Sequence, residues 1–170
     1  MEINHPFIGH ALNAVDAKGR VSVPASFRAQ VELRVKVYGV EGDETKGKEL
    51  TIAPAPGGKS LRAYDVVGQR QLIQEITESV ADLPAAERRT ALAAAKRTEL
   101  GNLLPVSFDG AGRMVLPQAL RDFVGITDLA FFIGVDDHFE IWGPDQAREA
   151  LADDPITLGM LAQHMKERAA

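Results

Sequence analysis

The sequence predicts an α+β fold, rich in β-strands, in which two tandem β modules share one core and are joined by a helical hairpin. Three observations predict it. A unit of the same pattern occurs twice, as VDAKGRVSVPASFR over 15–28 and as FDGAGRMVLPQALR over 108–121. A helix-forming segment separates the two copies, and two short helical segments follow the second copy. We expect these parts: a first module over 7–66, a helical linker over 67–102, a second module over 103–146 and a C-terminal helical tail over 147–170.

Each copy of the unit contains turn, strand and helix signals in the same order. Asp16 and Asp109 favour a turn, because an Asp carboxylate can accept hydrogen bonds from backbone N–H groups two residues on. Gly19 and Gly112 allow the positive φ that a tight turn often requires. An alternating run, RVSV or RMVL, then predicts a short strand, and a proline suits the start of the amphipathic stretch that follows. We therefore interpret these Asp and Gly residues as structural turn residues.

A hairpin is predicted after each unit. LTIAPAPGGKSLRAYD and LAFFIGVDDHFEIWGP both consist of an apolar strand, a turn and a second strand. The first contains APAPGGKS over 53–60, which is close to a phosphate-binding loop. Ala53 replaces the first glycine of that motif, however, and its two prolines have no N–H to offer a phosphate. We predict a plain hairpin turn there, and an exposed, glycine-containing loop over 41–49.

Helical periodicity appears between and after the two copies. One predicted face consists of Val66, Ile73, Ile76, Val80 and Leu83. The segment AAERRTALAAAKRTEL is strongly helix-forming and is followed by Gly-Asn. PDQAREALADD and PITLGMLAQHMKERAA predict two short terminal helices. A short unit cannot bury its own apolar face well, so the two copies should pair about an approximate two-fold axis, and identical chains can assemble further.

Composition excludes several kinds of site. The chain has no cysteine, which rules out disulfides, thiolate metal sites and a cysteine nucleophile. The longest apolar run, Leu129–Val135, is far short of the roughly 20 residues of a membrane span, and the N-terminus lacks the pattern of a signal peptide. The four histidines are not spaced as metal ligands, and no serine has the G-x-S-x-G frame. We predict no catalytic residue, no metal and no cofactor, no enzyme activity, and a cytoplasmic location.

Charge is distributed unevenly along the chain. The net charge is −5, but residues 1–40 carry five Lys/Arg against three Asp/Glu, whereas residues 123–170 carry three against nine. Lys18 lies in the first turn, and Arg20 and Arg113 begin the strands. Side by side, these cations would form a strip that fits a DNA backbone, and an Arg fork can also bind guanine edges.

Three alternatives to DNA binding remain. The charged turns can be merely solvated, or the chain can be a protein-interaction module such as an antitoxin-like partner, or it can be a small enzyme.

The two D-x-x-G-R units, with FEIW over 139–142, resemble the MraZ family of bacterial transcription factors over roughly residues 7–151. The resemblance implies two SpoVT/AbrB-type swapped-hairpin modules that form a pseudo-two-fold β barrel. It implies a ring-shaped homo-oligomer of the octamer or dodecamer class that binds short direct repeats in double-stranded promoter DNA. It further implies a repressor of the division and cell wall gene cluster, associated with the nucleoid and not with a membrane.

The resemblance also implies which residues face DNA. Arg20, Lys18 and Arg113 occupy the motif positions, whereas Ala111 stands at the second lysine position, so the second copy should contribute less charge. We add Arg28, at the end of the first unit, to the candidate DNA-binding residues. The loop over 41–49 and the Pro/Gly-rich hairpin depart from the family pattern, and we expect them to affect ring contacts or partner surfaces.

Overall fold

The computed structural model describes residues 5–39 and 44–170. The strands are β1 (His10–Ala14), β2 (Arg20–Ser22), β3 (Glu49–Pro54), β4 (Leu61–Tyr64), β5 (Leu104–Ser107), β6 (Arg113–Val115), β7 (Leu129–Val135) and β8 (His138–Trp142). Six of them form an antiparallel sheet in the order β1-β7-β8-β4-β3-β5, and β2 and β6 form a separate two-stranded ribbon.

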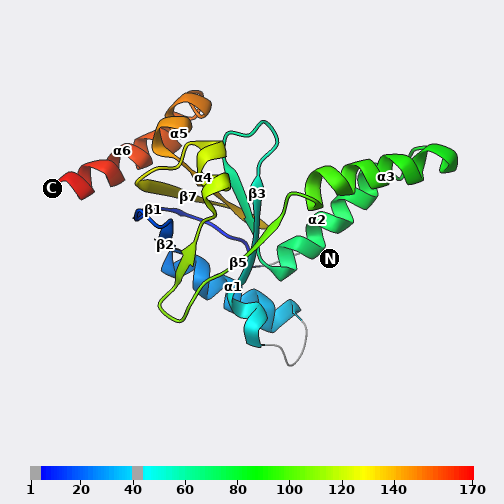
Figure 1. The fold of residues 1–170 in the computed structure, drawn as a ribbon, viewed down its shortest axis with the longest axis horizontal. Helices are drawn as coiled ribbons and strands as arrows, with labels where there is room; N and C mark the ends of the chain where they lie inside the picture. The colour runs from blue at the N-terminus through cyan, green and yellow to red at the C-terminus, as the bar shows by residue number, and fades with distance from the viewer. Residues whose placement is uncertain (1–4, 40–43) are drawn as a thin grey trace.

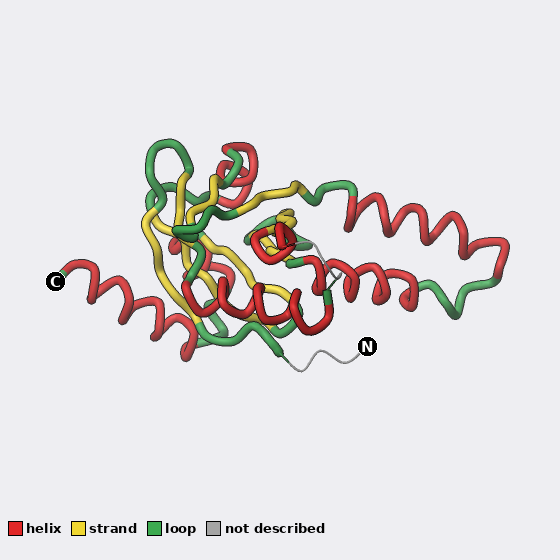
Figure 2. The backbone as a smooth tube through the Cα atoms, turned by 90° about the horizontal axis from the view of Figure 1, so that it is seen from below, coloured by secondary structure: helices red, strands yellow, loops and turns green. Residues whose placement is uncertain are grey.

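Helices surround the sheet and extend from it. They are α1 (Ala25–Tyr38), α2 (Val66–Ser79), α3 (Ala85–Leu100), α4 (Gln118–Val124), α5 (Pro144–Ala150) and α6 (Pro155–Ala169), with a short 3₁₀ helix, η1 (Glu44–Lys48). Figure 1 shows α2 and α3 projecting as an arm on one side, whereas α6 projects on the other, and Figure 2 shows the same arrangement from below. The helical hairpin between the copies and the C-terminal helices are confirmed. No helix in the described part of the chain is long and apolar enough to cross a bilayer.

Two parts of the expected fold class are wrong. The sheet is open rather than a closed barrel, because β1 and β5 are its edges and, among the described strands, β2 and β6 form ladder pairs only with each other. The fold is also less rich in β-strands than expected, since the helices contain more residues than the strands. The helix after the first unit has 14 residues, whereas its counterpart after the second unit has 7.

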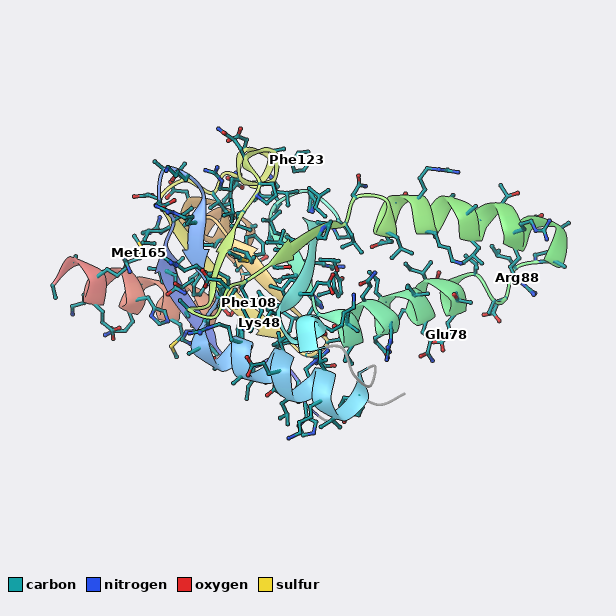
Figure 3. The ribbon with its side chains drawn as sticks, turned by 60° about the horizontal axis from the view of Figure 1, so that its bottom comes forward. Lys48, Glu78, Arg88, Phe108, Phe123 and Met165 are labelled. Carbon is teal, nitrogen blue, oxygen red and sulfur yellow. The ribbon has the colours of Figure 1, made fainter. Side chains whose placement is uncertain are left out.

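The strands of the two copies pair with one another. β1 pairs with β7, β2 with β6 and β3 with β5, all antiparallel. Phe108, the first residue of the second unit, lies beside Lys48 of the first copy, and its N–H donates to the Lys48 carbonyl over 3.0 Å (Figure 3). Apolar positions that are equivalent in the two units face one shared core, as expected: Val21 and Met114, Val23 and Leu116, and Phe27 and Leu120. Neither copy therefore completes its sheet or its core alone.

A buried ion pair, which sequence reasoning did not anticipate, ties several segments together. Arg34 on α1 and Asp65, the N-cap of α2, are fully buried, with Nε–Oδ2 and Nη2–Oδ1 distances of 2.8 and 3.1 Å. The Arg34 guanidinium also donates to the carbonyl oxygens of His5, Asp136 and Asp137, at 3.0, 3.3 and 3.2 Å. The pair thus links α1, the base of the α2–α3 arm, the N-terminal segment and the β7–β8 turn.

The predicted apolar face of the helical hairpin is confirmed in part. Ile76 and Val80 are buried as expected, whereas Ile73 and Leu83 are each 36 % exposed. Leu72, which lies outside the predicted face, is buried together with Ile76 and Tyr64 of β4, and this cluster packs against α3. The helix begins after Asp65, whose side chain accepts a hydrogen bond from Gly68 N at 2.7 Å, and this start directs Leu72 toward the sheet.

The two irregular segments of the first copy have different outcomes. Residues 55–60 form the β3–β4 turn, with Gly57 and Gly58 at φ +91° and +67°, and residues 53 and 54 end β3, so the predicted hairpin turn is confirmed. Of the expected loop over 41–49, residues 41–43 lie outside the described residues. Residues 44–48 form η1, which contacts α1. This part is therefore helical rather than an exposed loop.

Replacing Asp65 by Asn should lower the free energy of unfolding by about 3–5 kcal/mol, because Arg34 would remain buried without a counter-charge. An Asn side chain can still cap α2, so the loss of stability measures the contribution of the negative charge of Asp65. Urea titration followed by circular dichroism measures it. The control is Asp145→Asn, whose carboxylate is 98 % exposed and pairs with Arg148; it should cost less than about 1 kcal/mol. Equal effects of the two variants would contradict the importance of the buried pair.

Candidate nucleic-acid interface

The two D-x-x-G-R turns have nearly the same geometry. Asp16 Oδ1 accepts hydrogen bonds from the N–H groups of Lys18 and Arg20, each at 2.9 Å. Asp109 Oδ1 accepts from those of Ala111 and Arg113, at 3.0 and 2.9 Å. In each turn the glycine N–H donates to the Asp carbonyl at 2.9 Å, and the glycine has a φ of +81° or +85°. The predicted roles of the Asp and Gly residues are consistent with these local bonds.

Each turn interlocks with the strand that follows the other turn. Leu116 N donates to the Gly19 carbonyl at 2.9 Å, and Val23 N donates to the Gly112 carbonyl at 2.8 Å. Between these two bonds, Val21 pairs with Met114 at the centre of the β2–β6 ribbon. The two turns are thereby held at opposite ends of one short ribbon.

Arg28 and Arg121 cover the turns in a reciprocal way. The Arg28 side chain lies against Gly112, and Arg121 lies against Gly19, where a Cβ would come within 2.8 Å of Arg121 Nε. Arg28 Nε donates to the Val23 carbonyl and Arg121 Nε to the Leu116 carbonyl, both at 3.0 Å. The structure therefore places Arg28 behind the turn of the other copy, with its Nε committed to the backbone. Arg121, its equivalent in the second copy, was not among the predicted site residues, although the repeat itself has an arginine at both positions.

The outer surface of the ribbon brings the remaining candidates together. We call Lys18, Arg20, Ser22, Arg113 and Val115 the ribbon face, because all five are exposed and lie on β2, on β6 or in the first turn. Arg20 is opposite Val115, and Ser22 is opposite Arg113, so the two arginines lie diagonally across the ribbon. Ser22 and Val115 were not predicted as site residues, but the alternation of buried and exposed residues in RVSV and RMVL contains the signal for both.

Carboxylates partly neutralise the arginines of the ribbon face. Arg20 Nε is 2.5 Å from Asp16 Oδ2, whereas Arg113 Nε is 3.7 Å from Asp109 Oδ2. The hydrogen bond from the Arg20 backbone N–H is the main cause that lowers the pKa of Asp16, and the Arg113 N–H does the same for Asp109. Both carboxylates are therefore held in the charged form. The Lys18 ammonium has no partner among the described residues, so it adds an uncompensated positive charge at the first turn, whereas Ala111 occupies the equivalent position in the second turn, at the opposite end of the ribbon.

Two other features lie away from the ribbon. His10 Nδ1 and His164 Nε2 are 2.7 Å apart, which sequence spacing did not suggest, but no group of three His, Cys, Asp or Glu in the described part of the chain could hold a metal. A groove of about 700 Å³ lies between the β3–β4 turn, the end of α3 and α4, and is mostly apolar. Phe123 of α4, labelled in Figure 3, is one of its lining residues and is 64 % exposed.

Replacing Gly19 by Ala should destabilise the protein by at least about 1–3 kcal/mol, since the φ of +81° is unfavourable for Ala and the new Cβ would meet the Leu116 carbonyl oxygen at 2.7 Å. Gly110→Ala is the matched control, because that glycine has no atom near its Cβ position and no positive φ. It should change the free energy of unfolding by less than about 0.5 kcal/mol. Thermal or urea unfolding of both variants measures the difference, and an unaffected Gly19→Ala variant would contradict the interlock.

Replacing Asp16 by Asn should make the protein less stable at neutral pH, with the difference from wild type shrinking in acid. A carboxyl whose pKa is lowered by folding stabilises the folded state above its unfolded pKa and loses that contribution as the pH falls through the folded value. Urea titrations at about pH 7 and about pH 3 measure the two differences. A difference that is independent of pH would show that the charge of Asp16 does not stabilise the turn.

Comparison with known proteins supports the resemblance. A family model described as "MraZ protein, putative antitoxin-like" matches residues 103–154, which include the second turn and β6. A protein of Ruegeria sp. (strain TM1040) is 35 % identical over 143 residues, covering 84 % of this chain and 80 % of the relative. A protein of Ruegeria pomeroyi is 34 % identical over 151 residues, with coverages of 87 % and 85 %, and one of Roseiflexus castenholzii is 27 % identical over 161 residues, with coverages of 95 % and 97 %.

All three relatives are named transcriptional regulator MraZ, so the prediction that the chain is not an enzyme agrees with its relatives. The Roseiflexus castenholzii match covers 95 % of the chain and therefore extends over both copies of the repeated unit. The chain therefore belongs to the MraZ family.

Proposed function

We propose that this protein is a transcriptional regulator that binds double-stranded DNA through the ribbon face. The observation that carries the proposal is the β2–β6 pairing, which brings Arg20 and Arg113, 93 positions apart in the chain, onto one exposed surface. Their side chains are 50 % and 58 % exposed. The names of the relatives as transcriptional regulators support the same function.

The dimensions of the ribbon fit the major groove of DNA. A two-stranded β-ribbon can enter that groove, and diagonal neighbours across an antiparallel pair are roughly 7–8 Å apart. This spacing is close to two base-pair steps of roughly 3.4 Å each. Arg20 and Arg113 can therefore address guanines about two steps apart, or the phosphates beside them. Lys18, at the end of the ribbon, is suited to a backbone phosphate.

Arg28 has a positioning role in this proposal. Its Nε holds the Val23 carbonyl and its side chain covers Gly112, so it supports the turn that carries Arg113. Its terminal guanidinium nitrogens have no hydrogen-bond partner among the described residues, and the side chain is half-buried. We therefore place it at the rim, where it can contact a phosphate without reading a base.

An oligomer explains how an acidic protein binds a polyanion. The net charge is −5, and one ribbon face offers few uncompensated cations. Several ribbons held in one ring would meet several DNA repeats, which makes the later contacts intramolecular and raises the apparent affinity. We propose a ring of the octamer or dodecamer class, built of swapped-hairpin SpoVT/AbrB-like modules over 7–66 and 103–146, that binds direct repeats. The target is the promoter of the division and cell wall gene cluster, which the protein represses in the nucleoid.

Replacing Arg20 by Ala should weaken binding to DNA from upstream of the protein's own gene by about 1–3 kcal/mol, without changing the fold or the mass of the oligomer. Gel shifts against a scrambled duplex measure the affinity, and light scattering measures the mass. Arg89→Ala is the control, because Arg89 is exposed on α3, whose arm projects away from β2 (Figure 1). Unchanged binding by Arg20→Ala would contradict the proposed interface, and a tightly co-purifying second protein would instead favour an interaction module.

The difference between the two turns predicts opposite changes in salt dependence. The logarithm of the DNA-binding constant falls linearly with the logarithm of the salt concentration. Lys18→Ala should make this negative slope shallower by about 0.9 for each ribbon bound, since one phosphate contact is lost. Ala111→Lys should make it steeper by a similar amount. Fluorescence anisotropy at several salt concentrations measures both slopes. If Ala111→Lys leaves the slope unchanged while Lys18→Ala reduces it, the second turn does not approach the DNA backbone.

A further inference from the structure

Val115 is an apolar side chain placed among the cations of the ribbon face. It is 54 % exposed, although its neighbours Met114 and Leu116 are almost completely buried. Strand alternation turns Val115 toward the same side as Arg113, and the register puts it directly opposite Arg20. Directly opposite residues have Cβ atoms about 4.5–5.5 Å apart. An apolar contact point is therefore available between two arginines.

The two copies of the unit differ at this position. Val115 corresponds to Ser22 in the first copy, just as Ala111 corresponds to Lys18. The first copy thus presents a lysine, an arginine and a serine, whereas the second presents an alanine, an arginine and a valine. The backbone of the ribbon is nearly symmetric, but one half of its surface is cationic and polar and the other half is partly apolar.

The surface around Val115 is open to a ligand. Val115 and Arg113 line a shallow recess together with Pro117 and residues 105–109. The recess is mostly apolar and lies next to the arginine that we place at the DNA. Whatever approaches Arg113 in the groove therefore also meets the methyl groups of Val115.

We propose that Val115 contacts the 5-methyl group of a thymine in the major groove, next to the base pair addressed by Arg20. This inference rests on the proposed function and adds a specificity-determining residue to it. Thymine presents an apolar group in the major groove, which the other three bases lack, and apolar side chains recognise it there. Because Ser22 replaces valine in the other half, the contact also distinguishes the two orientations of the ribbon on DNA.

The test uses the sequence upstream of the protein's own gene, which wild-type protein should bind in preference to scrambled DNA. Two duplexes that both contain this sequence are compared. One contains thymine, and the other contains deoxyuridine at every thymine position, which removes only the methyl groups. Wild-type protein should bind the deoxyuridine duplex about fourfold more weakly for each thymine that Val115 contacts, the value expected for losing one buried methyl group. Val115→Ser should bind the thymine duplex more weakly than wild type and should bind both duplexes equally.

A matched control separates this contact from changes in DNA shape. Val37 on α1 is 50 % exposed and lies outside the ribbon face, so Val37→Ser removes the same atoms and should keep the wild-type preference for thymine. A thymine preference that persists in Val115→Ser comes from DNA shape and would overturn the inference. Equal binding of both duplexes by wild type, with specific binding retained, would overturn it while leaving the proposed function intact. If wild type binds neither duplex better than scrambled DNA, the proposed function and this inference both fail.

Discussion

Two backbone hydrogen bonds connect the turns of this protein, one from Leu116 N to the Gly19 carbonyl and one from Val23 N to the Gly112 carbonyl. Gly19 lies closer to the Leu116 carbonyl oxygen, and Gly112 closer to the Arg28 side chain, than a Cβ would allow. With both bonds made, β2 and β6 must run antiparallel, and Val21 and Met114 must point into the core between them. The outward position of Arg20 and Arg113 follows from the same alternation.

The buried pair of Arg34 and Asp65 has a comparable role at the base of the arm. The helical hairpin from Val66 to Leu100 is 35 residues long, and its apolar packing on the sheet is made through Leu72, Ile76 and Tyr64 near its base. The hairpin is anchored through its first residues, where Asp65 caps α2 and accepts the Arg34 guanidinium. Arg34 also binds carbonyl groups of the β7–β8 turn, so the second copy takes part in holding an element that follows the first.

The architecture of the ribbon is symmetric, and its surface chemistry is not. Asp16 and Asp109 make equivalent backbone bonds, and Arg28 and Arg121 cover equivalent glycines. Two pairs of equivalent positions on the ribbon, 18 and 111 and 22 and 115, differ between the copies, and the side chains at all four positions are exposed. The Asp, Gly and Arg residues of the interlock are thus repeated, and Arg20 recurs as Arg113 on the ribbon face, whereas the exposed residues around these two arginines have diverged. We therefore assign the interlock to folding and propose that the ribbon face binds DNA, with unequal contributions from its two halves.

The sequence by itself determined the local structure. The D-x-x-G-R turns, the short strands after them, the hairpins and the helical linker depend on hydrogen bonds and φ angles within a few residues, so Asp16, Gly19, Asp109 and Gly112 could be recognised directly. The doubled unit also indicated that two copies share one core. Arg20 and Arg113 could be selected as candidates, because their positions in the repeated unit are equivalent.

Only the tertiary structure decided which distant segments meet. The sheet is open because β2 and β6 pair with each other, and no local pattern encodes that choice of partner. Arg28 was assigned to DNA from its place in the unit, yet its position against Gly112 depends on a turn 84 residues away. The ion pair between Arg34 and Asp65 could not be predicted from the sequence either, since an arginine on a helix is usually solvated. The physical reason is the same in each case: a contact between distant residues is fixed by the packing of the whole chain, whereas a turn is fixed by its own backbone.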